Sequence, residues 1–228
     1  MAASEYRAQG RGGKGVRAMT TREEDYVETV FTASTHDYIL FFTNFGRVYR
    51  KKGYQIPEAG RTARGTNIVN IIPVEPGEKV SAMIAGRGVT EDNYLVFVTR
   101  NGTVKRTAQS AFKNIRSNGI RALSLDEGDE LISVLQTTGE DKILLATHDG
   151  MAICFAETDA RAMGRDAVGV RGIRLREGDY VVGAGRAGGG TELLSVTENG
   201  YGKRTAIDEY LRGGEDASPQ RRGGMGVK

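Results

Sequence analysis

The segment AQGRGGKGVRAM at residues 8–19 interleaves glycines with Arg11, Lys14 and Arg17. Arginine and lysine neutralise phosphate groups, and glycines let the backbone lie close to them. Such a segment suits the phosphate cradle of an enzyme, a disordered basic tail, or one copy of a repeated unit. These three possibilities make different demands on the rest of the sequence.

The residues that flank the glycines exclude a nucleotide cradle. GRGGKG at residues 10–15 and GAGRAG at residues 183–188 both match the G-x-G-x-x-G pattern of dinucleotide sites. Such a site needs a strand before the glycines and a helix after them, whereas both runs precede predicted strands. A Walker motif is also excluded, because Ala8 replaces its first glycine and Gly15 its Ser or Thr. We expect GAGRAGGG to form a flexible hairpin tip.

Few residues are suited to nucleophilic, acid–base or metal chemistry. The single cysteine, Cys154, lies in the apolar run AICFA and is expected to be buried. His36 and His148 occupy non-equivalent places with no nucleophile beside them, so we expect structural roles. The carboxylates cluster in acidic turns that recur along the chain, which indicates solvated turns on one rim. We therefore predict no catalytic residue, no metal site and no cofactor in this chain.

Positive charge recurs at fixed places. It follows a Thr-x-x-Gly turn in RVYRKK (residues 47–52), TVKR (103–106) and YGKR (201–204), and it precedes glycine-led strands. The third copy reads MAICFAE after its turn, which predicts a weaker contact there. The candidate phosphate-contacting residues are Gln9, Arg11, Gly12, Gly13, Lys14, Gly15, Arg17, Arg47, Arg50, Lys51, Lys52, Arg61, Arg64, Lys105, Arg106, Arg116, Arg121, Arg165, Arg171, Arg174, Lys203, Arg204, Arg221 and Arg222.

The elements that must position these residues form a repeat. Four apolar runs end in Thr-x-x-Gly turns, with glycines at 46, 102, 150 and 200. Glycines that lead into a strand fall at 15, 65, 119, 172 and 226, and an acidic turn follows in each copy. The predicted repeats are residues 9–60, 61–114, 115–167 and 168–219, with 220–228 starting a fifth, all in one domain.

Each repeat is predicted to contain about four strands. Runs such as YILFFT and YLVFVT are short, rich in β-branched and aromatic residues, and bounded by turns, which is typical of strands buried on both faces. Only QSAFKNI, TDARAM and IDEYLR indicate single helical turns. A period near 50 residues with four short strands is typical of propeller blades. We predict an all-β, propeller-like array of four-stranded blades, whose ends can stay open.

The composition agrees with a folded, soluble domain. The chain has 228 residues, 39% of them hydrophobic and 27% charged, so it can bury a core. No apolar run approaches the roughly 20 residues that span a bilayer, so we expect a cytoplasmic protein without membrane contact. The net charge is only +3, so a polyanion would be recognised by the placement of charge rather than by its excess.

Basic positions on one rim would form a curved track. Duplex DNA, whose persistence length is roughly 150 base pairs, would bend along such a track if the phosphate contacts offset the elastic cost. Two other classes remain open. A protein-interaction scaffold would bind a partner through its loops. The simplest alternative for the recurring charges themselves is that they only solvate exposed strand edges and discourage edge pairing. An RNA binder would use GRGG, LRGG and RRGG, although few aromatic residues accompany them.

Several segments resemble the family of DNA gyrase A C-terminal domains. They include EYRAQGRGGKGVRAM, ASTHDYILFFTNFGRVYR, RTARGTNIVNIIPVEPGEK, AMGRDAVGVRGIRLREGD and TENGYGKRTAIDEY, and they cover the whole chain in order. The resemblance implies a β-pinwheel that wraps double-stranded DNA without sequence preference, with Gln9 to Gly15 as its signature box. It also implies the rest of gyrase A and the whole of gyrase B as partners, a location at the nucleoid, and no enzyme activity in this chain, since ATP and magnesium are used elsewhere in the enzyme.

Three features depart from the family pattern. Gly10 replaces an arginine of the box, and a near copy, QRRGGMG at Gln220 to Gly226, has Met225 in place of the lysine. The chain holds four complete copies where the family has six. The related topoisomerase IV domain is the alternative, but its box is typically degraded, so the nearly intact box at Gln9 favours gyrase.

Overall fold

The computed structural model describes residues 2–16, 26–60, 63–86, 93–188, 192–212 and 218–228. In these ranges the regular elements are short strands and single-turn 3-10 helices, and none of the helices is long and apolar enough to cross a membrane. The strands are β1 (Tyr38–Thr43), β2 (Arg47–Lys52), β3 (Val80–Gly86), β4 (Tyr94–Thr99), β5 (Thr103–Ala108), β6 (Ile120–Arg121), β7 (Leu131–Thr137), β8 (Lys142–Thr147), β9 (Ala152–Ala156), β10 (Val170–Arg171), β11 (Val181–Ala187), β12 (Glu192–Val196) and β13 (Gly202–Ala206).

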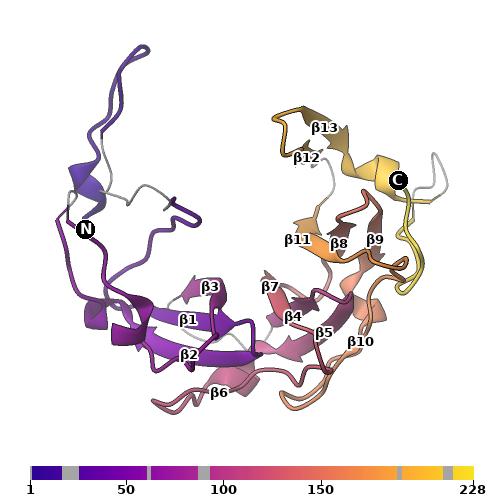
Figure 1. Cartoon of the computed structure of the whole chain (residues 1–228), viewed down its shortest axis with the longest axis horizontal. Coiled ribbons are helices and arrows are strands. Elements are labelled where there is room, and N and C mark those ends of the chain that lie inside the picture. Colours follow the sequence, from indigo (N-terminus) through magenta and orange to yellow (C-terminus); the bar gives the residue numbers. More distant parts are fainter. Residues whose placement is uncertain (1, 17–25, 61–62, 87–92, 189–191, 213–217) are drawn as a thin grey trace.

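The strands form small antiparallel sheets that follow one another in an open crescent (Figure 1). The first two sheets have four strands each, in the orders β3-β1-β2-β6 and β7-β4-β5-β10. The third has the order β11-β8-β9 and gains a single bridge between Ala152 and Val227, and the fourth consists of β12 and β13. The prediction of an all-β, propeller-like, open array is therefore confirmed, with complete four-stranded sheets in the first two copies.

The first three sheets each receive a segment from farther along the chain. The hairpin β1–β2 receives β6, and the hairpin β4–β5 receives β10. Val227 bridges Ala152 in the same way. The glycine that precedes each of these strands is Gly119, Gly169 or Gly226, so the expected landmark at Gly172 is wrong by three residues. After Gly65 the chain forms the 3-10 helix η3 (Ile68–Asn70) instead of the expected strand.

The apolar core lies between neighbouring sheets. Alternate residues of β4 point in opposite directions, so Leu95 and Phe97 pack toward the first sheet and Val96 and Val98 toward the third. Phe42, Phe97 and Phe112 meet edge to face or tilted, with ring centroids 5.6 to 6.2 Å apart. This two-sided burial explains why the strands read as continuous apolar runs, and it fixes each sheet against the next.

In the acidic turns at residues 75–78, 126–130 and 176–179, one carboxylate holds the Thr-x-x-Gly turn of the same sheet. Thr43 Oγ1 donates to Glu78 Oε1 at 2.6 Å. The backbone amides of Asn101 and Asp149 donate to Asp129 Oδ1 at 2.9 Å and Asp179 Oδ1 at 3.0 Å. Glu78 and Asp179 are buried, so the expectation that these turns are solvated is wrong for them. A buried carboxylate needs such donors because desolvation otherwise disfavours its charge.

Of the remaining local predictions, most are confirmed and one is wrong. Single helical turns occur at η4 (Gln109–Phe112), η5 (Glu157–Asp159) and η6 (Ile207–Tyr210), as predicted. The run GAGRA at residues 183–187 belongs to β11, so the expected hairpin tip there is wrong. Cys154 is fully buried, and burial raises the pKa of its thiol to about 11, so little thiolate forms at neutral pH.

Candidate nucleic-acid interface

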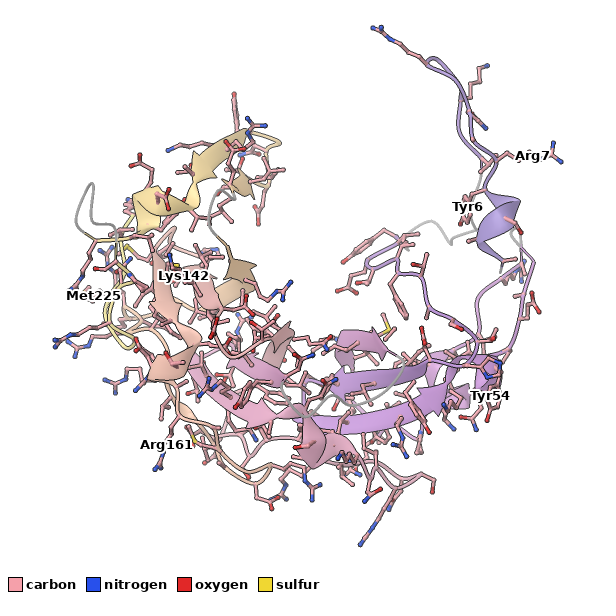
Figure 2. All side chains as sticks on the ribbon, turned by 180° about the vertical axis from the view of Figure 1, so that it is seen from behind. Tyr6, Arg7, Tyr54, Lys142, Arg161 and Met225 are labelled. Atoms are coloured by element: carbon pink, nitrogen blue, oxygen red, sulfur yellow. The ribbon has the colours of Figure 1, made fainter. Side chains whose placement is uncertain are left out.

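Several candidate basic residues lie on the convex side of the crescent. The inner strands β3, β7 and β11 line its concave side, and β6 and β10 lie on the outside (Figure 1). Arg121 and Arg171 are the second residues of these two outer strands, and both are exposed. Arg161, which precedes β10, also points outward (Figure 2). The exposed candidates among the described residues are Arg11, Lys14, Arg64, Arg116, Arg121, Arg171, Arg174, Lys203, Arg204 and Arg221.

Strand β6 and the residues that follow it (120–124) meet the loop before β10 (163–167) at a contact that we call the first junction. Ser124 donates through Oγ to the main-chain oxygen of Asp166 at 2.9 Å and through its amide to Ala167 at 3.2 Å. Arg121 and the half-buried Arg165 therefore come from segments more than 40 residues apart and lie on joined loops. The local sequence around either residue does not predict this contact.

The second junction is the contact between residues 171–174 and the box at residues 220–226. The amide of Gly223 donates to Gly172 O at 2.7 Å, and the amide of Arg174 donates to Gly224 O at 2.8 Å. Arg222 donates through Nε to Asp159 O at 3.0 Å and through Nη1 to Arg171 O. Arg171, Arg174 and Arg221 remain exposed beside it.

The first box, Gln9 to Gly15, lies in an N-terminal segment that projects away from the sheets (Figure 1). Its hydrogen bonds are internal: Gly15 N donates to Gln9 Oε1 at 2.9 Å, and Gly13 N donates to Gly10 O at 3.0 Å. Gln9, Arg11, Gly12, Gly13 and Lys14 are all exposed. The box is thus a closed loop with its two cations directed to solvent, which suits contact with a polyanion.

Lys105 does not belong among the candidate DNA-binding residues. Its side chain has no exposed surface, and its ammonium donates to the main-chain oxygens of Ala122, Gly164 and Arg165. A phosphate cannot reach it, so the prediction that it contacts DNA is wrong. The adjacent Arg106 is mostly covered, because its guanidinium lies over the Tyr94 ring and 3.7 Å from Glu157.

Other candidates are partly engaged within the protein. Arg47 donates to Asn118 O at 2.8 Å and to the Tyr49 hydroxyl at 3.1 Å, and its Cα is paired with that of Arg121 across β2 and β6. Arg50 and Lys52 both lie over the ring of Tyr38. Lys51 is half-buried. The candidates Arg17 and Arg61 lie outside the described residues.

The third hairpin carries no cation after its turn, as the sequence indicated, but the fold brings cations to it. Gln220 N donates to Cys154 O at 2.7 Å, and Val227 exchanges both backbone hydrogen bonds with Ala152. The second box therefore runs along β9 and places Arg221 at this edge. Sequence reasoning missed this arrangement because the box lies about 70 residues after the hairpin, and the only available signal was its likeness to the first box.

The described residues contain one group with donor atoms close enough for a metal ion. His148, Asp149 and Asp179 each offer one such atom within 4.8 Å of the others. However, Asp179 Oδ1 already accepts from two backbone amides. Burial raises the pKa of Asp179, but hydrogen bonds from Thr147, Asp149 and Tyr180 outweigh it and leave the pKa lowered. We assign the group to the turn, as for Glu78 and Asp129.

Known proteins match the whole chain. The family described as "DNA gyrase C-terminal domain, beta-propeller" matches residues 1–34, 37–86, 93–138, 141–187 and 191–228. The DNA gyrase A proteins of Staphylococcus aureus strains NCTC 8325 and COL are 50% identical over 99% of this chain, and the chain spans 25% of the length of those relatives.

Solved structures agree in fold. The structure of a DNA gyrase A C-terminal domain has a TM-score of 0.76 and 28% identity, covering 100% of this chain and 71% of that one. The crystal structure of the C-terminal domain of a DNA topoisomerase IV has a TM-score of 0.75 and 30% identity, covering 85% of this chain and 58% of that one. With its interlocked sheets, recurring turns and glycine box, the chain belongs to the family of DNA gyrase C-terminal β-propeller domains.

Proposed function

We propose that the chain binds double-stranded DNA without sequence preference and bends it along the convex edge of the crescent. The observation that carries the proposal is the pair of junctions, which bring exposed arginines from distant segments to the outside of successive sheets. Phosphate contacts of this kind position a duplex but confer no sequence preference. Several contacts spaced along a curved edge favour a bent path over a straight one.

The first box extends this surface. Arg11 and Lys14 are exposed on a loop whose glycines carry no side chain that would keep the backbone away from a phosphate. We infer that the box captures the duplex where it leaves the convex edge. The sites of weaker contact are the half-buried candidates Arg47, Arg50, Lys51 and Lys52.

Membership in the gyrase family supports a role as the DNA-wrapping part of a type II topoisomerase. In this proposal the remainder of gyrase A together with gyrase B supplies cleavage and ATP hydrolysis with magnesium, and this chain has no enzyme activity of its own. The complex would act on the nucleoid in the cytoplasm. The similarity to a topoisomerase IV domain keeps that enzyme as the alternative, and the 50% identity to gyrase A proteins favours gyrase.

The test is relaxation of a closed circular plasmid by a type I topoisomerase with increasing amounts of the chain. If the chain wraps DNA, the linking number read on a gel shifts in proportion to the protein bound. DNA binding in a filter assay without any shift would contradict wrapping. Absence of binding at physiological salt would contradict the whole proposal and favour a protein-interaction scaffold.

The double variant Arg11→Ala, Lys14→Ala distinguishes the role of the first box from the role of the convex edge. Because the box is exposed and only self-bonded, the variant should fold normally and retain most duplex binding, but it should lose the linking-number shift. The measurement is the same plasmid assay, with the far-ultraviolet circular dichroism spectrum as a folding control. Equal loss of binding and shift would show that the two surfaces do not have separate roles.

A further inference from the structure

Lys105 is the feature of this molecule that the proposed function does not use. It lies on β5 with its Cα opposite that of Phe97, and its ammonium is 5.2 Å from the centre of the Phe97 ring. It is fully buried, which is unusual for a lysine unless its charge is compensated. Its compensation comes from backbone carbonyls: Ala122 O at 2.5 Å, Arg165 O at 2.7 Å and Gly164 O at 3.2 Å.

These three carbonyls belong to the two loops of the first junction. Ala122 directly follows Arg121, and Arg165 is itself a candidate phosphate contact. A lysine ammonium has three N–H donors, which match the three acceptors. One buried side chain from β5 therefore holds together two segments that lie about 40 residues apart in the chain and carry exposed or half-buried arginines. Ser124 adds a second link between the same loops.

We propose that Lys105 is a positioning residue for DNA binding: it ties the loops at 120–124 and 163–167 together and thereby sets the spacing of Arg121 and Arg165 on the convex edge. This inference rests on the proposed DNA binding and adds to it a residue that never touches the duplex. The structure offers a comparison within the same sequence pattern, since Lys203 also stands third after its Thr-x-x-Gly glycine, in YGKR, and is exposed on β13.

The first experiment needs no DNA. An amine-acylating reagent applied to the folded chain should modify Lys203 readily and leave Lys105 protected, as read by mass spectrometry of peptides. Lys105→Met keeps an unbranched side chain in the site but removes the donors. Hydrogen exchange should then become at least tenfold faster at residues 122–124 and 163–167 and stay unchanged in β8 and β9. Unchanged exchange in both loops would overturn the proposal.

The second experiment measures duplex affinity against salt at pH 6.5, where the ammonium form is favoured. Each lost phosphate contact reduces the magnitude of the slope of log K against log salt by about 0.9, so the salt dependence becomes shallower. Lys105→Met should lower it by about 1.8 and weaken binding roughly tenfold, because both Arg121 and Arg165 lose their positions. Lys203→Met should lower it by no more than about 0.9. A change of about 0.9 or less for Lys105→Met would mean that the residue does not position two contacts.

Ser124→Ala keeps the test decisive if Lys105→Met fails to fold. It removes only the link from Ser124 Oγ to Asp166 O, and it should speed exchange at residues 164–167 and reduce the salt slope. If neither changes, acylation of the wild-type chain decides: modification of Lys105 as fast as that of Lys203 would overturn the proposal. If the wild-type chain does not bind duplex DNA, the proposed function fails, while the exchange data still show whether Lys105 holds the two loops.

The pH profile provides an independent readout. Burial lowers the pKa of Lys105 to about 7, with Asp166 raising it and Arg165 lowering it. In the unfolded chain a lysine titrates near about 10.4. Between these values the unfolded state holds more protons, so the free energy of unfolding should rise with pH above about 7 and not depend on this group below it. Lys105→Met should remove that rise, and an identical rise in the variant would exclude a buried, titrating lysine.

Discussion

The heptapeptides QGRGGKG at residues 9–15 and QRRGGMG at residues 220–226 differ at two of seven positions, but they occupy different surroundings. The first is exposed and bonded to itself. The second lies along the third sheet, where Val227 pairs with Ala152 and Gly223 donates to Gly172 O. Nearly the same heptapeptide therefore forms an exposed loop in one place and runs along a strand in the other. The difference depends on whether a free sheet edge lies next to it.

The cations of the two boxes differ accordingly. Arg11 and Arg222 are equivalent in sequence, but only Arg222 has its guanidinium engaged by main-chain oxygens. Gly15 and Gly226 are also equivalent, and both have a positive φ. A Cβ at Gly15 would meet open space, whereas at Gly226 it would collide with the main-chain oxygen of Ala152. The second box therefore contributes to the stability of the fold, and the first box contributes an exposed basic surface.

The largest effect is expected from valine at the last box glycine. Gly226→Val should lower the free energy of unfolding by about 3 kcal/mol, because the positive φ is strained and the side chain collides with β9. The measurement is urea unfolding followed by circular dichroism. Gly15→Val is the matched control: its positive φ is strained in the same way, but its side chain meets no neighbour, so it should cost only about 1–2 kcal/mol. Equal losses would mean that the second box is not docked on the sheet.

A smaller effect is expected from the equivalent arginines. Arg222→Ala should cost about 1–2 kcal/mol of stability, since two main-chain oxygens lose a charged donor. Arg11→Ala should leave the unfolding curve unchanged and weaken duplex binding instead. The two variants are compared by urea unfolding and by filter binding at fixed salt. Loss of stability in Arg11→Ala would contradict the free state of the first box.

The smallest effect is expected from exchanging the sixth box residue. Met225 is exposed and points outward from the convex side (Figure 2), so Met225→Lys adds a cation beside Arg221 without entering the core. We expect the slope of log K against log salt to become steeper by about 0.9. Lys14→Met should make it shallower by the same amount. A change in Lys14→Met alone would show that only the first box contacts the duplex.

Much of the fold follows from local patterns. The alternation of β-branched and aromatic runs with Thr-x-x-Gly turns correctly predicted the hairpins, the all-β class and the short helical turns. The site was harder, because exposure depends on neighbours. Lys105 and Lys203 stand at equivalent places, yet one is buried against carbonyls and the other is exposed. Burial of Glu78 and Asp179 was missed because a carboxylate-rich turn looks the same whether solvated or bonded.

The sequence by itself determined the repeat, the strands, the turns and the presence of two boxes, because all of these depend on residues close together in the chain. Only the tertiary structure decided which later segment completes each sheet, where the loops meet at the junctions, and which cations face solvent. These features depend on contacts between residues tens of positions apart. A backbone edge or a carbonyl accepts any segment that the topology brings to it, so no local pattern specifies the partner.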